Sequence, residues 1–131
     1  MGAGKGVAQK TAEFFQDEYP SLRVVGCSST NPGEGAFREV KTSGAEVLLV
    51  AYGAPKQEEW IAQYAPRLKL FHVMAVGGSF DFWSGNVKRA PSFMRKLGIE
   101  WLWRLFLQPL KRAKRIWDAT IRFPLISLFF A

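Results

Sequence analysis

The chain has 131 residues, of which 48% are apolar and 15% aromatic, so its composition is that of a globular domain and not of a disordered segment. The length allows one domain with a modest core. A single cysteine, Cys27, excludes an internal disulfide, and no run of about 20 apolar residues is present that could span a bilayer.

The net charge of +7 is concentrated in the last third of the chain. Residues 1–87 contain 8 Lys/Arg and 9 Asp/Glu, a balance of −1. Residues 88–131 contain 10 Lys/Arg and 2 Asp/Glu, a balance of +8, together with Trp101, Trp103 and Trp117. A basic segment rich in aromatic residues is typical of a part that binds an anionic surface.

The N-terminal residues combine a glycine cluster with a helix. Gly2, Gly4 and Gly6 precede a helix predicted over Val7–Tyr19, and Pro20 ends it. A glycine loop that leads into a helix N-terminus can bind phosphate, although glycine clusters often have no ligand. Such loops normally follow a strand. Because no strand precedes this one, we expect the chain to begin inside a fold.

Three apolar runs predict strands, with helices between them. The predicted strands are Leu22–Gly26, Glu46–Tyr52 and Leu70–Val76, and the predicted helices that follow the first two are Ala36–Ser43 and Gln57–Tyr64. The unbroken apolar run of the second strand predicts burial on both faces. We therefore expect an α/β fold with a partial Rossmann-like parallel sheet. On this interpretation His72 is a core residue and Cys27 a small buried filler.

The residues after the sheet predict helices only. They are Ser92–Leu97, Ile99–Gln108 and Leu110–Arg122. On the last helix an apolar stripe lies opposite Lys111, Arg112, Lys114 and Arg115, a pattern typical of a helix that lies in a membrane interface. The chain is therefore predicted to divide into a partial α/β domain, residues 1–91, and a helical membrane-docking appendage, residues 92–131.

Two polar loops follow the second and third predicted strands, at the edge where open α/β sheets bind ligands. In the first, Lys56 and Gln57 start a helix and suit a diphosphate or a sugar hydroxyl; alternatively Pro55 is only a helix-starting residue and Lys56 is solvated. In the second, Asp81 follows a glycine pair and could bind a sugar or ribose hydroxyl or act as a base. A capping role is the alternative.

These loops resemble the WecG/TagA/CpsF family of bacterial glycosyltransferases. The matching motifs are Gly6-Val7-Ala8, Gly53-Ala54-Pro55-Lys56-Gln57-Glu58 with Trp60, Gly77-Gly78-Ser79-Phe80-Asp81-Phe82, Gly85-Asn86-Val87-Lys88-Arg89-Ala90-Pro91 and Leu97-Gly98-Ile99-Glu100-Trp101-Leu102-Trp103-Arg104-Leu105. Their order and spacing agree over most of the chain, which makes this resemblance far more specific than a glycine pattern.

The resemblance implies an inverting transferase without a metal or other cofactor. The donor would be a UDP-sugar such as UDP-N-acetylmannosamine, and the acceptor N-acetylglucosamine on a polyprenyl diphosphate at the cytoplasmic face of the membrane. The implied donor-binding residues are Gly2, Gly6, Gly53, Pro55, Lys56, Gln57, Gly77, Gly78, Phe80 and Asp81. The implied contacts to the lipid diphosphate and an anionic membrane are Arg104, Lys111, Arg112, Lys114, Arg115 and Trp117.

The resemblance also implies departures from the family. Lys111 and Lys114 stand where the family favours arginine, so a bidentate contact to diphosphate is lost there. Family members have an N-terminal half with the acceptor pocket and the expected catalytic base, and this chain starts after it. Asp81 is the second choice for the base. We expect a fragment, a split protein or a degenerate copy, which pairs with the missing half or with itself.

Three functions remain open from the sequence. The first is the nucleotide-sugar half of a polyprenyl-linked glycosyltransferase, and the second a UDP-sugar-binding module without turnover. The third, a nucleic-acid-binding protein, is the weakest, because the basic residues of 110–122 lie opposite a coherent apolar stripe and not among aromatic side chains.

Overall fold

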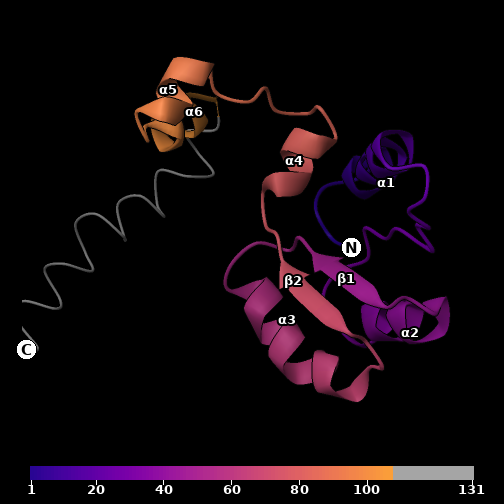
Figure 1. The fold of residues 1–131 in the computed structure, drawn as a ribbon. Helices are drawn as coiled ribbons and strands as arrows, with labels where there is room; N and C mark the ends of the chain where they lie inside the picture. The colour runs from indigo at the N-terminus through magenta and orange to yellow at the C-terminus, as the bar shows by residue number, and fades with distance from the viewer. Residues whose placement is uncertain (108–131) are drawn as a thin grey trace, which may run out of the picture. The chain divides into compact units, whose positions relative to one another are not determined.

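The computed structural model describes residues 1–107, which belong to two compact units, residues 1–88 and residues 89–131 (Figure 1). The first unit contains the sheet and the second contains helices only in its described part. The predicted helix 110–122 and its basic stripe lie outside the described residues. The described part is mixed α/β, as the sequence predicts.

A two-stranded parallel sheet is the centre of the first unit. β1 (Val47–Val50) pairs with β2 (His72–Ala75) in the register Val47 to His72 through Val50 to Ala75. The connection between the strands contains α3 (Lys56–Tyr64) and a short 3-10 helix, η1 (Ala65–Arg67). This strand–helix–strand unit confirms the crossover predicted from the spacing of the apolar runs.

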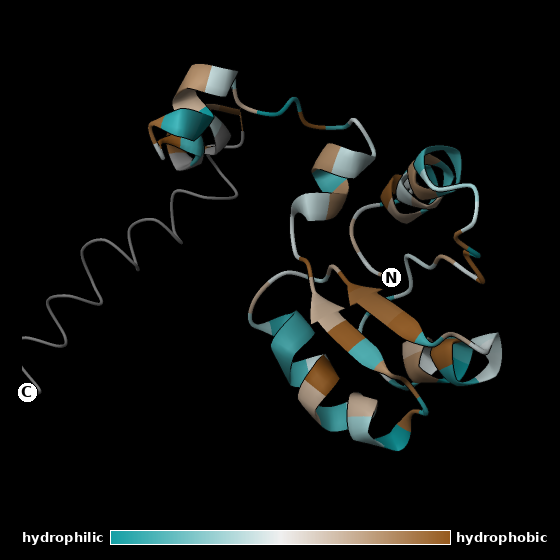
Figure 2. Cartoon of the chain, in the orientation of Figure 1, coloured by the Kyte–Doolittle hydropathy of each residue, from teal (hydrophilic) through white to brown (hydrophobic). Residues whose placement is uncertain are grey.

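Helices cover both faces of β1. One apolar cluster joins β1 to α2 (Glu34–Ser43) and α3, and its buried members are Met1, Ala36, Phe37, Val40, Leu48, Val50, Trp60 and Tyr64. A second joins the opposite face of β1 to α1 (Val7–Glu18) and α4 (Ser79–Trp83), and its buried members are Val7, Ala8, Ala51 and Phe80. Figure 2 shows the apolar strand between helices that each have hydrophilic and hydrophobic residues. Burial is confirmed on the face that carries Leu48 and Val50; on the opposite face Leu49 is partly buried and Val47 is exposed.

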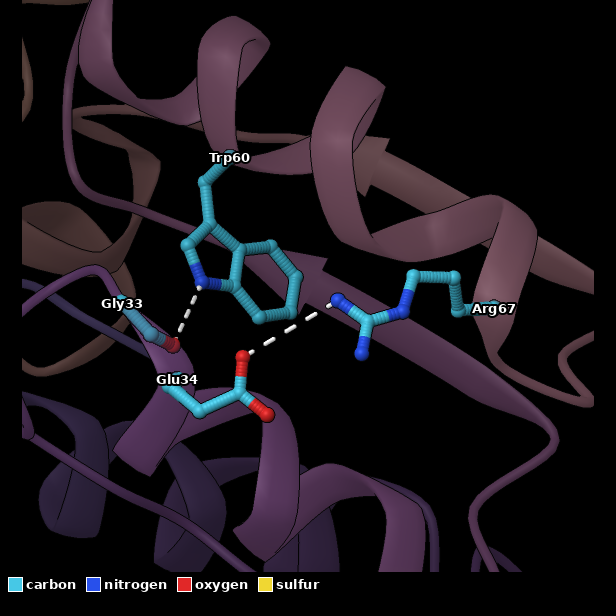
Figure 3. Close-up of polar contacts among 4 residues, drawn as sticks. All are labelled: Gly33, Glu34, Trp60 and Arg67. Atoms are coloured by element: carbon cyan, nitrogen blue, oxygen red, sulfur yellow. Dashed lines mark hydrogen bonds and ion pairs between the residues drawn. The ribbon is translucent and has the colours of Figure 1, made fainter.

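Trp60 anchors α3 to the start of α2. Its indole is buried, and its Nε1–H donates to the Gly33 carbonyl oxygen at 3.2 Å (Figure 3). Nearby, the Arg67 guanidinium lies 3.9 Å from the Glu34 carboxylate and 4.4 Å from the centre of the Phe37 ring. Both ions are about half exposed, so the ion pair contributes at most about 1 kcal/mol. Burial of the indole, worth about 3 kcal/mol, stabilises this contact more than the ion pair does.

Three predictions on the sheet side are wrong. Leu22–Gly26 is not a strand; it has no regular structure. His72 is exposed, because the face of β2 that packs against α3 carries Val73, and His72 and Met74 lie on the opposite face. Cys27 is also exposed, and its Sγ–H donates to Gln9 Oε1 on α1 at 2.8 Å. In addition, α4 forms in what the sequence suggests is a loop, Ser79–Trp83.

The second unit contains α5 (Ser92–Lys96) and α6 (Glu100–Leu107) in its described part. These two helices confirm the first two of the three helices predicted after the sheet. They are linked through Gly98, whose φ of 72° lies in the left-handed region that glycine adopts without strain. No helix within residues 1–107 is long and apolar enough to cross a membrane.

The N-terminal amine lies within the sheet. Met1 and Ala3 pair with Ala51 in parallel fashion, through the bonds from Ala51 N–H to the Met1 carbonyl (2.8 Å) and from Ala3 N–H to the Ala51 carbonyl (3.0 Å). The Met1 amine donates to the Leu49 carbonyl at 2.7 Å. Desolvation lowers the pKa of this amine from 8.0 to about 6, against a smaller opposing effect of Cys27.

This lowered pKa predicts a pH-dependent stability. Between pH 6 and pH 8 the unfolded chain binds a proton that the folded chain does not, so the free energy of unfolding should rise with pH across that window. Two pKa units correspond to about 2.7 kcal/mol, and residual solvent contact reduces the expected rise to roughly 2 kcal/mol. Urea unfolding at a series of pH values, with protein that retains Met1, measures it. The chain acetylated at Met1 is the control and should lose the rise; an equal rise in both forms would contradict the assignment.

Candidate functional site

Four loops meet at the carboxyl edge of the sheet. Residues 1–3, β1 and β2 run parallel and side by side, because Gly2 pairs with Ala51 and Val76 N–H donates to the Val50 carbonyl at 2.8 Å. The chain after each of them, residues 4–6, 52–56 and 77–78, therefore leaves at one edge. A fourth loop joins them, because Gly2 N–H donates to the Ser28 carbonyl at 2.8 Å. This edge is the usual ligand site of open parallel sheets.

Gln57 joins the loops that follow β1 and β2. It is buried in the first turn of α3, where its Oε1 accepts from Gly53 N–H at 3.2 Å and its Nε2 donates to Glu58 Oε1 at 2.8 Å. Gly77 lies directly beside this amide, since a Cβ at that position would be 3.6 Å from Gln57 Oε1. The two bonds use one amide N–H and one lone pair of the oxygen, which leaves hydrogen-bonding capacity for a ligand.

Lys56 and Pro55 precede Gln57 at the end of the same loop. Lys56 is exposed and is the first residue of α3, so its charge adds to the positive end of the helix dipole. The Ala54–Pro55 peptide bond is cis. Together with Gln57, Lys56 provides a cationic and a hydrogen-bonding group one residue apart. That pair of groups suits a phosphate beside a sugar or ribose hydroxyl.

Gly2 allows the N-terminal strand to approach the loop after β1. A Cβ on Gly2 would lie 2.8 Å from Tyr52 Cδ1 and 3.0 Å from the Ala51 carbonyl carbon, and its φ is +89°. Gly6 also has a positive φ, +77°, but a Cβ there would meet nothing within 4 Å. Of these two predicted phosphate-loop glycines, Gly2 is therefore required by packing, and Gly6 forms the exposed start of α1.

The residues after β2 differ in their surroundings. Gly78 precedes α4, and Phe80 is buried against α1, where its carbonyl accepts from Thr11 Oγ1 at 3.3 Å. Asp81 is partly exposed on α4, and its carbonyl accepts from Val87 N–H at 2.9 Å and Ser84 Oγ at 3.3 Å. The Phe80 side chain packs in the core, whereas the Asp81 side chain reaches solvent.

Tyr52 is a candidate that the sequence does not indicate. Its hydroxyl is buried and has no hydrogen-bond partner within the described part of the chain. Burial raises the pKa of this phenol to about 12, and the Glu39 carboxylate adds to the shift. A buried hydroxyl without a partner costs about 1–3 kcal/mol, so a ligand or water that bonds to it is favoured.

Glu39 belongs to a polar network beside Tyr52. Its Oε1 accepts from the Thr30 hydroxyl at 2.7 Å, and the Ser28 hydroxyl donates to Thr30 Oγ1 at 2.9 Å. Hydrogen bonds from Ser28 and Thr30 lower the pKa of the Glu39 carboxyl, so it is ionised at neutral pH. The loop after residue 27 therefore contributes hydroxyl groups, and α2 contributes a carboxylate, to this polar network.

The other predicted contacts are only partly described. Arg104 belongs to α6 in the second unit, and Lys111, Arg112, Lys114, Arg115 and Trp117 lie outside the described residues. Within residues 1–107 no three His, Cys, Asp or Glu side chains are grouped so that they could hold a metal ion.

Residues 1–129 match the family described as the glycosyl transferase WecG/TagA/CpsF family. Two similar curated proteins carry the name N-acetylglucosaminyldiphosphoundecaprenol N-acetyl-beta-D-mannosaminyltransferase. The one from Bacillus subtilis strain 168 is 36% identical over 110 residues, and the one from Bacillus spizizenii strain W23 is 34% identical over 110 residues. Each match covers 82% of this chain and 43% of the relative. The matched part thus spans less than half the length of these relatives.

The contrast between Gly2 and Gly6 can be tested by substitution. Both Gly2→Ala and Gly6→Ala must hold alanine at positive φ, which costs about 1–2 kcal/mol. Gly2→Ala must in addition displace the Tyr52 ring and the Ala51 backbone, so its total loss of stability should reach about 3 kcal/mol or more. Urea unfolding midpoints of the two variants measure the difference. Equal losses would show that the close approach at Gly2 is absent in solution.

Proposed function

The chain belongs to the WecG/TagA/CpsF family of glycosyl transferases, and from this premise we propose that it forms the nucleotide-sugar side of a transferase. The proposed donor is UDP-N-acetylmannosamine, and the proposed acceptor is N-acetylglucosamine on a polyprenyl diphosphate. The names of both relatives support this sugar and this acceptor. Such a product is a linkage unit for teichoic acid or another cell-surface polysaccharide.

The convergence of Gly53, Gln57 and Gly77 carries the proposal within the structure. It supports a Rossmann-like donor site at the strand edge, with the Gln57 amide on a sugar or ribose hydroxyl and the Lys56 ammonium on the diphosphate. The charge of Lys56 would also stabilise the UDP that leaves during transfer. The Tyr52 hydroxyl, buried at the same edge, is a further group for the donor.

We propose an inverting, single-displacement transfer. In such a reaction a base takes the proton of the acceptor hydroxyl, the hydroxyl oxygen bonds to the anomeric carbon, and the bond from that carbon to UDP breaks. Asp81 is the candidate base in this chain, because its side chain reaches solvent at the end of the loop after β2. The first choice is a carboxylate in the N-terminal half of longer family members. If Asp81 does not act as the base and that second carboxylate is not supplied, the chain would bind the donor without transferring the sugar.

The second unit supports a role at the membrane surface. Phe93, Leu97 and Phe106 are each more than 60% exposed, and Arg95 and Lys96 are exposed on α5. Exposed apolar side chains beside basic ones are typical of segments that lie in the headgroup region of anionic membranes. We therefore propose that residues 89–131 dock on the inner face of the cell membrane, where the lipid-linked acceptor lies. A nucleic-acid partner is not favoured.

Donor binding tests the first proposal. UDP should bind the folded chain and raise its thermal midpoint. Gln57→Ala should weaken binding by about 1–3 kcal/mol, the cost of a lost buried polar contact, as measured by calorimetry. Gln63→Ala is the matched control, because Gln63 is exposed near the other end of α3 and should leave affinity unchanged. No UDP binding at millimolar concentration, or equal effects of the two substitutions, would remove the proposed donor site.

Vesicle binding tests the membrane proposal. The chain should bind vesicles with anionic lipid and not neutral ones at physiological salt, with about 1 kcal/mol from each basic residue near the surface. Reversing the charges of Lys111, Arg112, Lys114 and Arg115 should therefore weaken binding at least about 1000-fold. Reversal of Lys5, Lys10, Lys41 and Lys69, all exposed in the first unit, is the matched control and should have little effect. Equal flotation with neutral and anionic vesicles would refute this docking.

A further inference from the structure

A hollow of about 890 Å³ lies in the sheet layer of the first unit. Residues 22–28 line one side and residues 44–49 the other, and α1 and α2 supply the remaining walls. The walls are mainly apolar: Ala12 and Phe15 come from α1, and Val40 comes from α2. Because the lining comes from both helical layers and from two extended segments, the hollow has the position of a strand. We call it the strand groove.

Within residues 1–107, the edge of β1 that faces the strand groove has ladder positions without a backbone partner. Along this strand the even-numbered residues bond toward β2: the Val50 carbonyl accepts from Val76 N–H and the Glu46 carbonyl from His72 N–H. The odd-numbered residues bond toward the other edge, where Met1 pairs with Leu49 and Ala51. Val47 and the Leu49 N–H continue that ladder into the groove beyond the reach of Met1. The groove therefore presents hydrogen-bonding groups as well as apolar walls.

The Met1 nitrogen marks the end of the groove. It donates to the Leu49 carbonyl at 2.7 Å, a bond that a peptide N–H makes in a parallel ladder. In Figure 1 the N-terminus lies beside the arrowhead of β1, so a segment that abuts this nitrogen would run back along β1. A peptide N–H at this position is neutral and avoids the burial of a charged amine.

Residues 22–26 show the other side of the same gap. Their sequence, Leu-Arg-Val-Val-Gly, has strand propensity, yet they form no strand, and Leu22 and Val25 are exposed. Two residues beyond this segment, the Ser28 carbonyl accepts a hydrogen bond from Gly2 N–H at 2.8 Å. A strand in the groove would lie between this segment and β1 and could pair with both. It would also cover the exposed side chains.

We propose that the strand groove binds an extended, mainly apolar polypeptide segment that continues into the Met1 nitrogen and adds to the sheet as a strand parallel to β1. Such a strand spans about three to five residues at 3.3 Å each alongside residues 45–49. It gives residues 22–26 a strand to pair with at the edge of the sheet, and it joins them through continuous hydrogen-bond ladders to β1 and β2. The curated relatives, more than twice as long as this chain's matched part, have the length to provide such a segment.

The test extends the full chain by five residues before Met1, as Val-Val-Ile-Val-Thr after a short soluble tag. The matched control carries Gly-Ser-Gly-Ser-Gly at the same place, which removes the charged amine equally but brings no apolar side chains. The valine-rich extension should raise Tm by about 5–10 °C over the control, because it buries apolar area in the groove. The reaction of the exposed Cys27 thiol, which lines the groove, should slow about tenfold or more.

Two results would overturn the proposal. One is an equal Tm and an equal Cys27 reaction rate in the two extended chains. The other is a dimer of the unextended chain in which Cys27 is already protected, because the groove would then bind a second copy; sedimentation velocity decides this. If the extended chain is poorly soluble, the acetylated peptide of the same sequence added to the unextended chain gives the thiol readout, and no protection at millimolar peptide contradicts the proposal.

Discussion

Burial of β1 on both faces is the constraint on which the rest of residues 1–88 depends. Leu48 and Val50 hold α2 and α3 on one side, and Leu49 with Ala51 holds α1 and α4 on the other. Helices pack on both faces of this strand, so apolar side chains of four helices converge on the segment from Leu48 to Ala51. The same strand also fixes where the loops end, because the N-terminal residues and β2 pair with its two edges.

The sequence predicts those parts of the fold whose signal is local. The apolar runs locate β1 and β2, and helical periodicity with Pro20 and Pro66 locates α1 and α3. The failures depend on neighbours that a periodic pattern does not contain. Residues 22–26 have strand-forming side chains but lack an adjacent strand over most of their length, and strands need partners to form. The apolar run around His72 likewise does not indicate which face of its strand a helix covers. The five residues of α4 are too few to show a period.

In the candidate site, too, some features follow from local sequence signals and others depend on residues distant in sequence. Parallel strands place their ends at one edge, so the convergence of Gly53, Gln57 and Gly77 could be expected from the order of the loops. The buried hydroxyl of Tyr52 could not, because Tyr52 packs against a cluster whose side chains come from several elements, including α2 and α3. The glycine motif also does not show that packing requires glycine at position 2, whereas a side chain at Gly6 would meet no neighbouring atom within 4 Å.

The outer edge of β2 affects how readily copies of the chain aggregate. Within the described residues this strand pairs only with β1, and its exposed neighbours include Phe71, 78% exposed, and Met74, 56% exposed. An uncovered edge with apolar side chains is a template for intermolecular pairing, which proteins commonly discourage with charge. Here the exposed Lys69 lies two residues before Phe71, and concentrated salt, which screens its charge, therefore favours precipitation of the chain.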